Sequence, residues 1–238
     1  MHVAAYIEKL LKELSRPTVK QQLAAIRMVF DYLVLGQVVP VNPAAAVRGP
    51  KYTTKRGKTP VLSSEEARQL LDSLNTSTVV GLRDRALIAL MVYTFARAGA
   101  ATSMDVEDWY FQKRRWWVRL HEKGGKRHEM PTHHNLEEYV SAYIEAAGIG
   151  KEKHTPLFRT AKGKTQQLTE RRMSQPEVYL MIRRRAAGAG IKTLIGCHTF
   201  RATGITAYLK GRRKTGGRTA NGRARIGARD RALRSARG

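Results

Sequence analysis

The stretch HTFRATGITAYLK, residues 198–210, has the mixture of aromatic and branched residues that is typical of a packed helix. It places His198 and Arg201 three positions apart, a spacing that puts both side chains on one face of a helix. From Gly211 to Gly238 the chain contains nine Arg, one Lys and six Gly, and no aromatic residue. We therefore expect the folded region to end near Lys210 and the segment 211–238 to be disordered.

The composition indicates a polyanionic partner, because the formal net charge is +25 over 238 residues. Residues 1–210 hold 34 Lys and Arg against 18 Asp and Glu, so they carry +16 by themselves. No apolar run approaches the roughly 18 residues of a membrane span, and the first residues lack a signal-peptide pattern. We expect a cytoplasmic protein without a membrane partner.

The single cysteine, Cys197, excludes an internal disulfide bond and a cysteine-rich metal site. No cluster of carboxylates indicates Mg²⁺ binding. The sequence thus predicts a protein without a metal or another cofactor.

Helical spacing of apolar residues predicts two N-terminal helices, over residues 3–14 and 18–34, with Pro17 at the start of the second. The run from Gly36 to Val61 has four prolines and three glycines, which is typical of a linker. We expect a helical unit over 1–50, a linker over 51–58 and a second domain over 59–210.

The second domain begins with a capping box, in which Ser63 and Glu66 start a helix. The apolar residues 82–100 predict a buried helix, and residues 135–147 and 175–189 also have helical spacing. Between them, the short segments DWYFQ, WWVRLH and KRHEMPTH predict about three antiparallel strands, with Lys123-Gly124-Gly125-Lys126 as a hairpin turn. The expected fold class is α+β, mostly helical, with a small antiparallel sheet.

Four residues together suit phosphoryl transfer: Arg97, Lys123, His198 and Arg201. Two guanidinium groups can bind the oxygens of a phosphodiester, and a lysine and a histidine can move protons. Each residue alone has an ordinary explanation, since an arginine at a helix end often binds carbonyl groups and a lysine before Gly-Gly is commonly a turn residue. Their order along the chain is what indicates a site.

The segments YTFARAGAATSMDVEDW, VRLHEKGGKRHEMPTH, HTPLFRT and HTFRATGITAYL together resemble the tyrosine recombinase or phage integrase family. The resemblance runs from about Thr18 to Lys210. It implies a catalytic domain preceded by part of a helical DNA-clamping domain, and site-specific DNA strand exchange without metal or ATP. It also implies that Arg97 and Arg201 are the catalytic arginines, Lys123 the general acid and His198 the histidine of the second arginine motif.

The sequence departs from the family pattern at two places. The family commonly has an acidic residue three positions after the first arginine, where this chain has Ala100. The family also has a nucleophilic tyrosine well beyond the second arginine, whereas this chain has no tyrosine after Tyr208. Tyr208 is expected to be a packing residue, because it lies two turns from Arg201 on the same helix.

The missing tyrosine predicts a frameshift near residue 210 and a chain that is defective in cleavage. The resemblance also implies an N-terminal bundle of four or five helices, and only two are expected here, so we expect the chain to be truncated at both ends. Double-stranded DNA is the expected partner, and intact recombinase protomers could join it on the same site. The predicted DNA contacts are Lys20, Arg27, Lys126 and Arg127. Two alternatives stay open: a DNA-binding protein without catalysis, and a basic RNA-associated protein.

Overall fold

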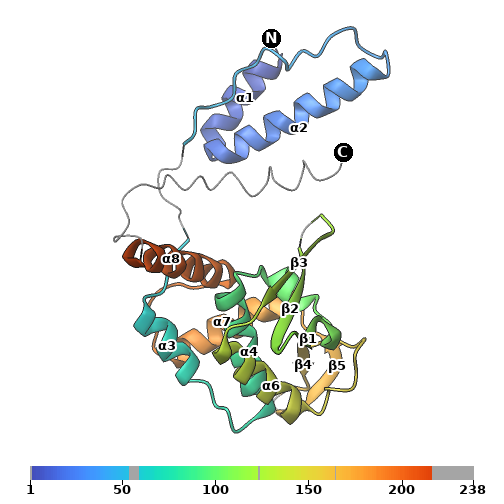
Figure 1. Ribbon diagram of the computed structural model, residues 1–238. Coiled ribbons are helices and arrows are strands. Elements are labelled where there is room, and N and C mark those ends of the chain that lie inside the picture. The colour runs from blue at the N-terminus through green and yellow to red at the C-terminus, as the bar shows by residue number, and fades with distance from the viewer. Residues whose placement is uncertain (1, 54–58, 123, 164, 216–238) are drawn as a thin grey trace. The chain divides into compact units, whose positions relative to one another are not determined.

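The computed structural model describes residues 2–53, 59–122, 124–163 and 165–215. The chain divides into two compact units, Met1–Lys58 and Thr59–Gly238 (Figure 1). Lys123, a predicted site residue, lies outside the described residues. So do residues 216–238, which are most of the segment that we expected to be disordered. No helix in the described part of the chain is long and apolar enough to cross a bilayer.

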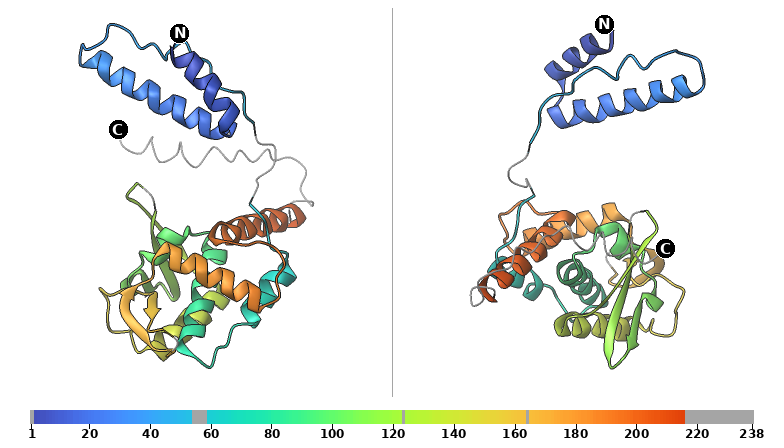
Figure 2. Two further views of the ribbon diagram at one scale, coloured as in Figure 1. Left: turned by 180° about the vertical axis from the view of Figure 1, so that it is seen from behind. Right: turned by 45° about the horizontal axis from the view of Figure 1, so that its top comes forward.

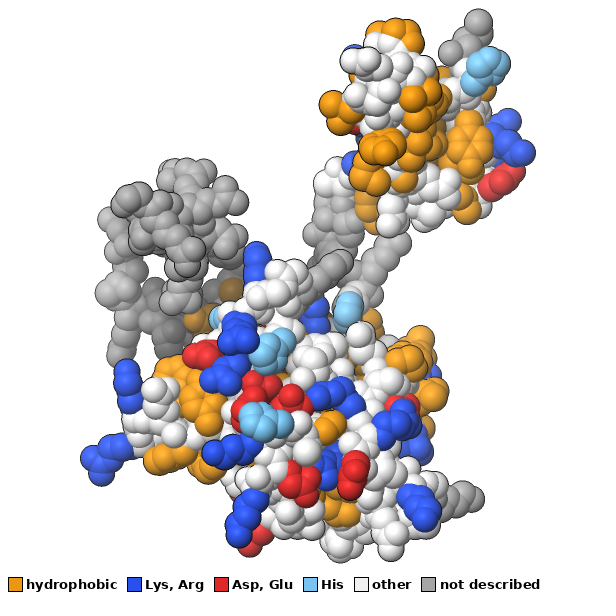
Figure 3. Space-filling model, turned by 90° about the vertical axis from the view of Figure 1, so that its right-hand side faces the viewer, with side chains coloured by type: hydrophobic (Ala, Val, Ile, Leu, Met, Phe, Trp, Pro, Cys, Tyr) orange, Lys and Arg blue, Asp and Glu red, His pale blue; other side chains and the backbone are white. Residues whose placement is uncertain are grey.

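The smaller unit is a pair of helices, α1 (His2–Glu13) and α2 (Arg16–Leu35), with a proline in the first turn of α2 as expected. Their contact buries four aliphatic side chains: Ile7, Leu10, Val19 and Leu23. Other apolar side chains from α2 and the loop after it are exposed, and Figure 3 shows hydrophobic side chains gathered on this unit. The most exposed of them are Met28, Tyr32, Leu35, Val38 and Val41.

The larger unit is built around α4 (Val79–Thr94), which is buried along most of its length. Figure 1 shows α4 among the other helices, and it packs most extensively against α6 (His134–Ala147) and α8 (Cys197–Thr215). The remaining long helices are α3 (Ser64–Asp72) and α7 (Gln175–Gly188). The predicted capping box of Ser63 and Glu66 is present at α3, since each residue binds the backbone of the other.

The prediction of one helix over residues 82–100, with Arg97 at its end, is wrong. α4 ends at Thr94, and Phe95 adopts a left-handed conformation with φ of 56°. A short helix, α5 (Ala98–Thr102), follows, and Arg97 is its N-cap residue. The apolar pattern continues through this break because both sides of it are buried, so periodicity alone did not reveal the break.

The three-stranded antiparallel sheet is confirmed. The 3₁₀ turn η1 (Val106–Asp108) leads into strands in the order β1-β2-β3, and β2 and β3 form a hairpin (Figure 2). The strands are β1 (Trp109–Gln112), β2 (Arg115–Glu122) and β3 (Lys126–Pro131). Glu122 pairs with Lys126 at the end of the hairpin, where Gly124 and Gly125 have φ of 82° and 73°, a region that favours glycine.

A second sheet was not predicted from the sequence. It consists of β4 (Arg159–Ala161) and β5 (Leu168–Arg172), which are antiparallel. Both strands are short, and β5 contains three charged residues, so they lack the alternation that identified the other strands.

A buried ion cluster joins α4, α7 and β4. The carboxylate of Asp84 is fully buried and accepts hydrogen bonds from Arg83, at 2.6 Å, and from Arg185, at 2.8 Å. Arg83 also donates to the carbonyl oxygen of Arg159, at 2.7 Å. A buried carboxylate needs such partners, because burial without them has a large desolvation cost.

The contact between α4 and α8 depends on Gly204. A Cβ atom at this position would lie 2.6 Å from ring carbons of Phe95 and closer still to the carbonyl oxygen of Val92. A residue without a side chain therefore lets α8 approach the end of α4. α8 itself runs through Thr215, five residues beyond the expected boundary at Lys210.

We predict that Gly204→Ala will lower the free energy of unfolding by roughly 1–3 kcal/mol, because the methyl group forces α8 away from α4. The matched control is Gly188→Ala, in a helix where a Cβ atom would meet nothing within 4 Å. Urea unfolding of both variants measures the difference. Equal stability of the two variants would contradict the close approach at Gly204.

Candidate functional site

One cavity of about 730 Å³ lies where α5, the end of β2 and the first turns of α7 and α8 meet. Arg97 and His198 both line it, although they are far apart in the sequence. The other elements contribute polar side chains to its wall, which are Ser103, His121, Glu122, Gln175 and Tyr179. The structure thus brings two of the four predicted site residues to one cavity.

Arg97 reaches the cavity because it caps α5 directly after the break in α4. Its side chain is 51% exposed, and its Nη1 donates to the carboxylate of Glu122 at the end of β2. Ala100, where the family commonly has an acidic residue, is buried and lines the cavity. The carboxylate partner of Arg97 comes instead from Glu122 on β2.

Arg201 lies one turn along α8 from His198 and is half-buried. Its Nη1 donates to the carbonyl oxygen of Phe95, two residues before Arg97. This carbonyl group belongs to the C-cap residue of α4, at the negative end of the helix dipole, where a cation is favourable. The guanidinium of Arg201 therefore lies beside the backbone that carries Arg97.

His198 is exposed in the first turn of α8, next to Cys197. Burial raises the pKa of the Cys197 thiol above its ordinary value. The thiol is therefore protonated at neutral pH and is a poor nucleophile. Lys123, the fourth predicted site residue, lies outside the described residues, and its neighbour Glu122 lines the cavity.

Sequence reasoning missed His121 and Glu122, which line the cavity from β2. The Nε2 atom of His121 lies 3.1 Å from a carboxylate oxygen of the buried Asp108. A signal was available in the sequence, because both residues directly precede the predicted hairpin turn at Lys123. The direction of each side chain depends on strand register, which the sequence did not provide.

The predicted DNA contacts occupy two kinds of environment. Lys20, Lys126 and Arg127 are exposed. Arg27 is half-buried, and its guanidinium donates to the carbonyl oxygens of Ala44 and Val47. Arg27 therefore holds the segment after α2 in place, and its contact with DNA stays a prediction.

The charged surface of the larger unit is mixed. On the face seen in Figure 3, Lys and Arg side chains lie beside Asp, Glu and His side chains. In the described part of the chain, no group of three or more His, Cys, Asp and Glu residues is arranged to hold a metal ion.

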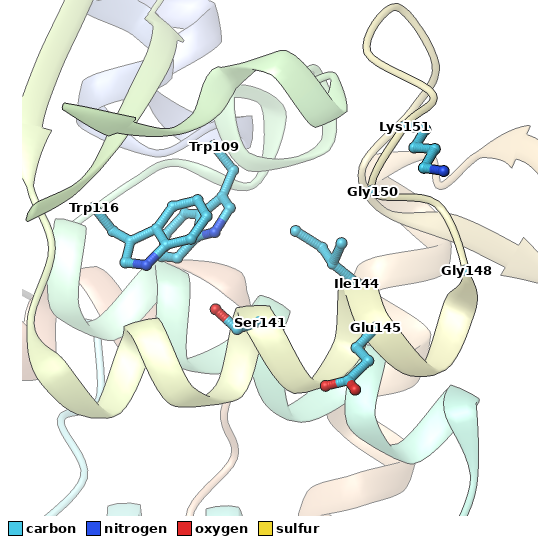
Figure 4. Close-up of a pocket in the computed structure, with 8 residues that line it drawn as sticks. All are labelled: Trp109, Trp116, Ser141, Ile144, Glu145, Gly148, Gly150 and Lys151. Carbon is cyan, nitrogen blue, oxygen red and sulfur yellow. The ribbon is translucent and has the colours of Figure 1, made fainter.

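A second cavity, of about 500 Å³, lies between the sheet and the end of α6 (Figure 4). The rings of Trp109 and Trp116 stack there at a centroid distance of 5.4 Å, and Ile144 extends toward them from α6. Lys151 is the one cationic side chain among its lining residues. This cavity is mainly apolar and lacks the arginines expected of a phosphate site.

Comparison with known families identifies the larger unit. The family model described as the phage integrase family matches residues 60–212. The chain belongs to the phage integrase family. The match covers every element from α3 to α8, including both arginine motifs.

The relatives of this family member include tyrosine recombinases. The chain is 26% identical to tyrosine recombinase XerC of Thermodesulfovibrio yellowstonii, over 82% of this chain and 64% of the relative. It is 27% identical to XerC of Chlamydia muridarum, over 86% of this chain and 62% of the relative. The chain thus spans less than two thirds of the length of these relatives.

Solved structures share the fold. The XerH site-specific recombinase bound to its palindromic difH substrate superposes with a TM-score of 0.69 and 19% identity, over 89% of this chain and 62% of that chain. Lambda integrase residues 75–356 bound to DNA superpose with a TM-score of 0.62 and 16% identity, over 88% and 71% of the two chains. At these identities, the likeness establishes the fold.

We predict that Arg97→Lys and Arg201→Lys will each weaken the binding of a short DNA duplex about threefold to tenfold. Lysine keeps the charge but loses the planar fork of donors that matches a phosphate. Fluorescence anisotropy at constant salt measures the change. Arg127→Lys is the control, because an exposed arginine on the hairpin can be replaced by a point charge with a smaller loss. Equal losses in all three variants would contradict a special role of the two motif arginines.

Proposed function

We propose that the chain binds the phosphate backbone of double-stranded DNA at the Arg97–His198 cavity, as part of a site-specific recombination system. The observation that carries this proposal is the convergence of Arg97, His198 and the anchored Arg201 on the break between α4 and α5. Membership of the phage integrase family and the DNA complexes of XerH and lambda integrase support it.

The chemistry of the cavity suits a phosphodiester. The guanidinium of Arg97 is half exposed, so it can donate to non-bridging oxygens. His198 lies in the first turn of a long helix, where the helix dipole favours an anion. Arg201 would add positive charge to the five-coordinate transition state, in which negative charge increases. Lys123 would act as the general acid.

The chain is proposed to bind DNA without cleaving it by itself. Its sequence has no tyrosine after Tyr208. Tyr208 lies on α8 with its ring edge-on to Phe95, at a centroid distance of 6.2 Å, and the residue is 54% exposed. Without a positioned hydroxyl group, the cations can stabilise a transition state that no nucleophile initiates.

The affinity of the chain for DNA should depend strongly on salt concentration. We expect the affinity for a DNA duplex to fall at least about 30-fold between about 50 and 200 mM salt, equivalent to about three neutralised phosphates. The net charge of +16 on residues 1–210 is the physical reason. Anisotropy titrations at several salt concentrations measure the slope.

Two outcomes would contradict the proposal. A flat salt response would exclude binding through phosphates. Tighter binding to an RNA of the same length than to an inverted-repeat DNA duplex would favour the alternative of an RNA-associated protein.

The second prediction concerns cleavage. We expect no covalent protein–DNA adduct when the chain is incubated with a nicked duplex that traps such intermediates, as measured by denaturing gel electrophoresis. Mixing the chain with an intact family recombinase on the same duplex tests whether a nucleophile acts in trans. An adduct formed by this chain alone and lost in Tyr208→Phe would show that α8 can deliver Tyr208 to the phosphate.

A further inference from the structure

We propose that Glu122 lowers the affinity of the Arg97 site for phosphate, and that DNA binds by displacing the Glu122 carboxylate from the Arg97 guanidinium. The inference rests on the proposed function of the same cavity. Glu122 would thereby set the affinity of Arg97 for phosphate, a role that the sequence motifs did not indicate.

Strand register gives Glu122 its direction. On β2 the buried residues Val118 and Leu120 alternate with more exposed ones, and Glu122 is next in the inward row. Its side chain is 18% exposed, so most of the side chain is removed from water. A carboxylate in this position requires a cation, and in the described part of the chain only Arg97 binds it.

Arg97 is only partly occupied by this contact. Its Nη1 binds Glu122, whereas Nε and Nη2 have no partner among the described residues. Half of the side chain is exposed to the cavity. The Nε–Nη2 edge of the guanidinium can therefore contact a phosphate before Glu122 leaves, and a further contact through Nη1 needs the donor that Glu122 holds.

Charge makes the two anions competitors. A phosphate oxygen at Arg97 would lie close to the Glu122 carboxylate, in a cavity where solvent screens charges less than at an open surface. One arginine would then face two negative groups. Removing the charge of Glu122 should therefore strengthen phosphate binding, whereas a residue that merely positioned Arg97 would weaken it when replaced.

The test compares Glu122→Gln with Glu129→Gln in the intact 238-residue chain. Glu129 is a matched control, because it lies on the neighbouring strand β3 and pairs with Arg119 at 2.8 Å, outside the cavity. We expect E122Q to tighten binding of a DNA duplex about threefold to tenfold and to steepen the salt slope by about one phosphate. We expect E129Q to change affinity less than about twofold.

A double-mutant cycle distinguishes competition for Arg97 from a purely structural role of Glu122. In an Arg97→Gln background, E122Q should have no further effect, because the competition requires Arg97. Weaker or unchanged binding of E122Q, an equal gain in E129Q, or a gain that persists in the Arg97→Gln background would each overturn the inference. The amide of E122Q could destabilise the fold where it is buried. If E122Q unfolds at a lower temperature than the original chain, the test is repeated with Glu122→Ala, which has no amide to bury.

Calorimetric titration with inorganic pyrophosphate separates this inference from the proposed function. If the original chain does not bind duplex DNA, the proposed function fails. The inference about Glu122 is then tested separately. It requires that E122Q binds pyrophosphate more tightly than the original chain and that Arg97→Gln removes this gain. No gain would overturn it.

Discussion

The candidate site depends on the break in the backbone at Phe95. A continuous helix from Val79 to Thr102 would use the carbonyl group of Phe95 within the helix, and it would direct Arg97 according to the helical period. The left-handed conformation of Phe95 instead ends α4, frees its carbonyl oxygen for Arg201 and makes Arg97 the N-cap residue of α5. One hydrogen bond thus ties the second arginine motif to the first. Gly204 makes the bond feasible, because it lets α8 approach the end of α4.

The cations of the protein have different physical roles according to their burial. Arg83 and Arg185 are held by the buried carboxylate of Asp84 and stabilise the packing of α4 and α7. Arg201 is half-buried and bound to a carbonyl group, which satisfies one of its donors without cancelling its charge. Arg97 is half exposed and neutralised by Glu122. A phosphate bound as proposed would meet an exchangeable positive charge at Arg97, and Arg201 would supply a prearranged one beside it. The large net charge by itself does not distinguish these roles.

Much of the fold could be predicted because its signals are local. The capping box at Ser63 and Glu66, the proline at the start of α2 and the glycine pair of the β2–β3 turn each act over a few residues. The break at Phe95 and the strands β4 and β5 were missed for the opposite reason. Phe95 adopts a left-handed conformation where α4 contacts the distant helix α8, and β4 and β5 pair with each other without an alternating apolar pattern.

The sequence by itself predicted most of the helices, the main sheet and a polyanionic partner, and it contains the order of Arg97, Lys123, His198 and Arg201, because periodicity, charge and motif order are properties of the chain. Only the tertiary structure decided which groups these residues meet. Arg97 could have met solvent or a carboxylate on α5, and it meets Glu122 because the register of β2 turns that carboxylate inward. Arg201 meets the end of α4 because two helices distant in sequence pack closely there. Such partners depend on contacts between distant segments, which no local pattern specifies.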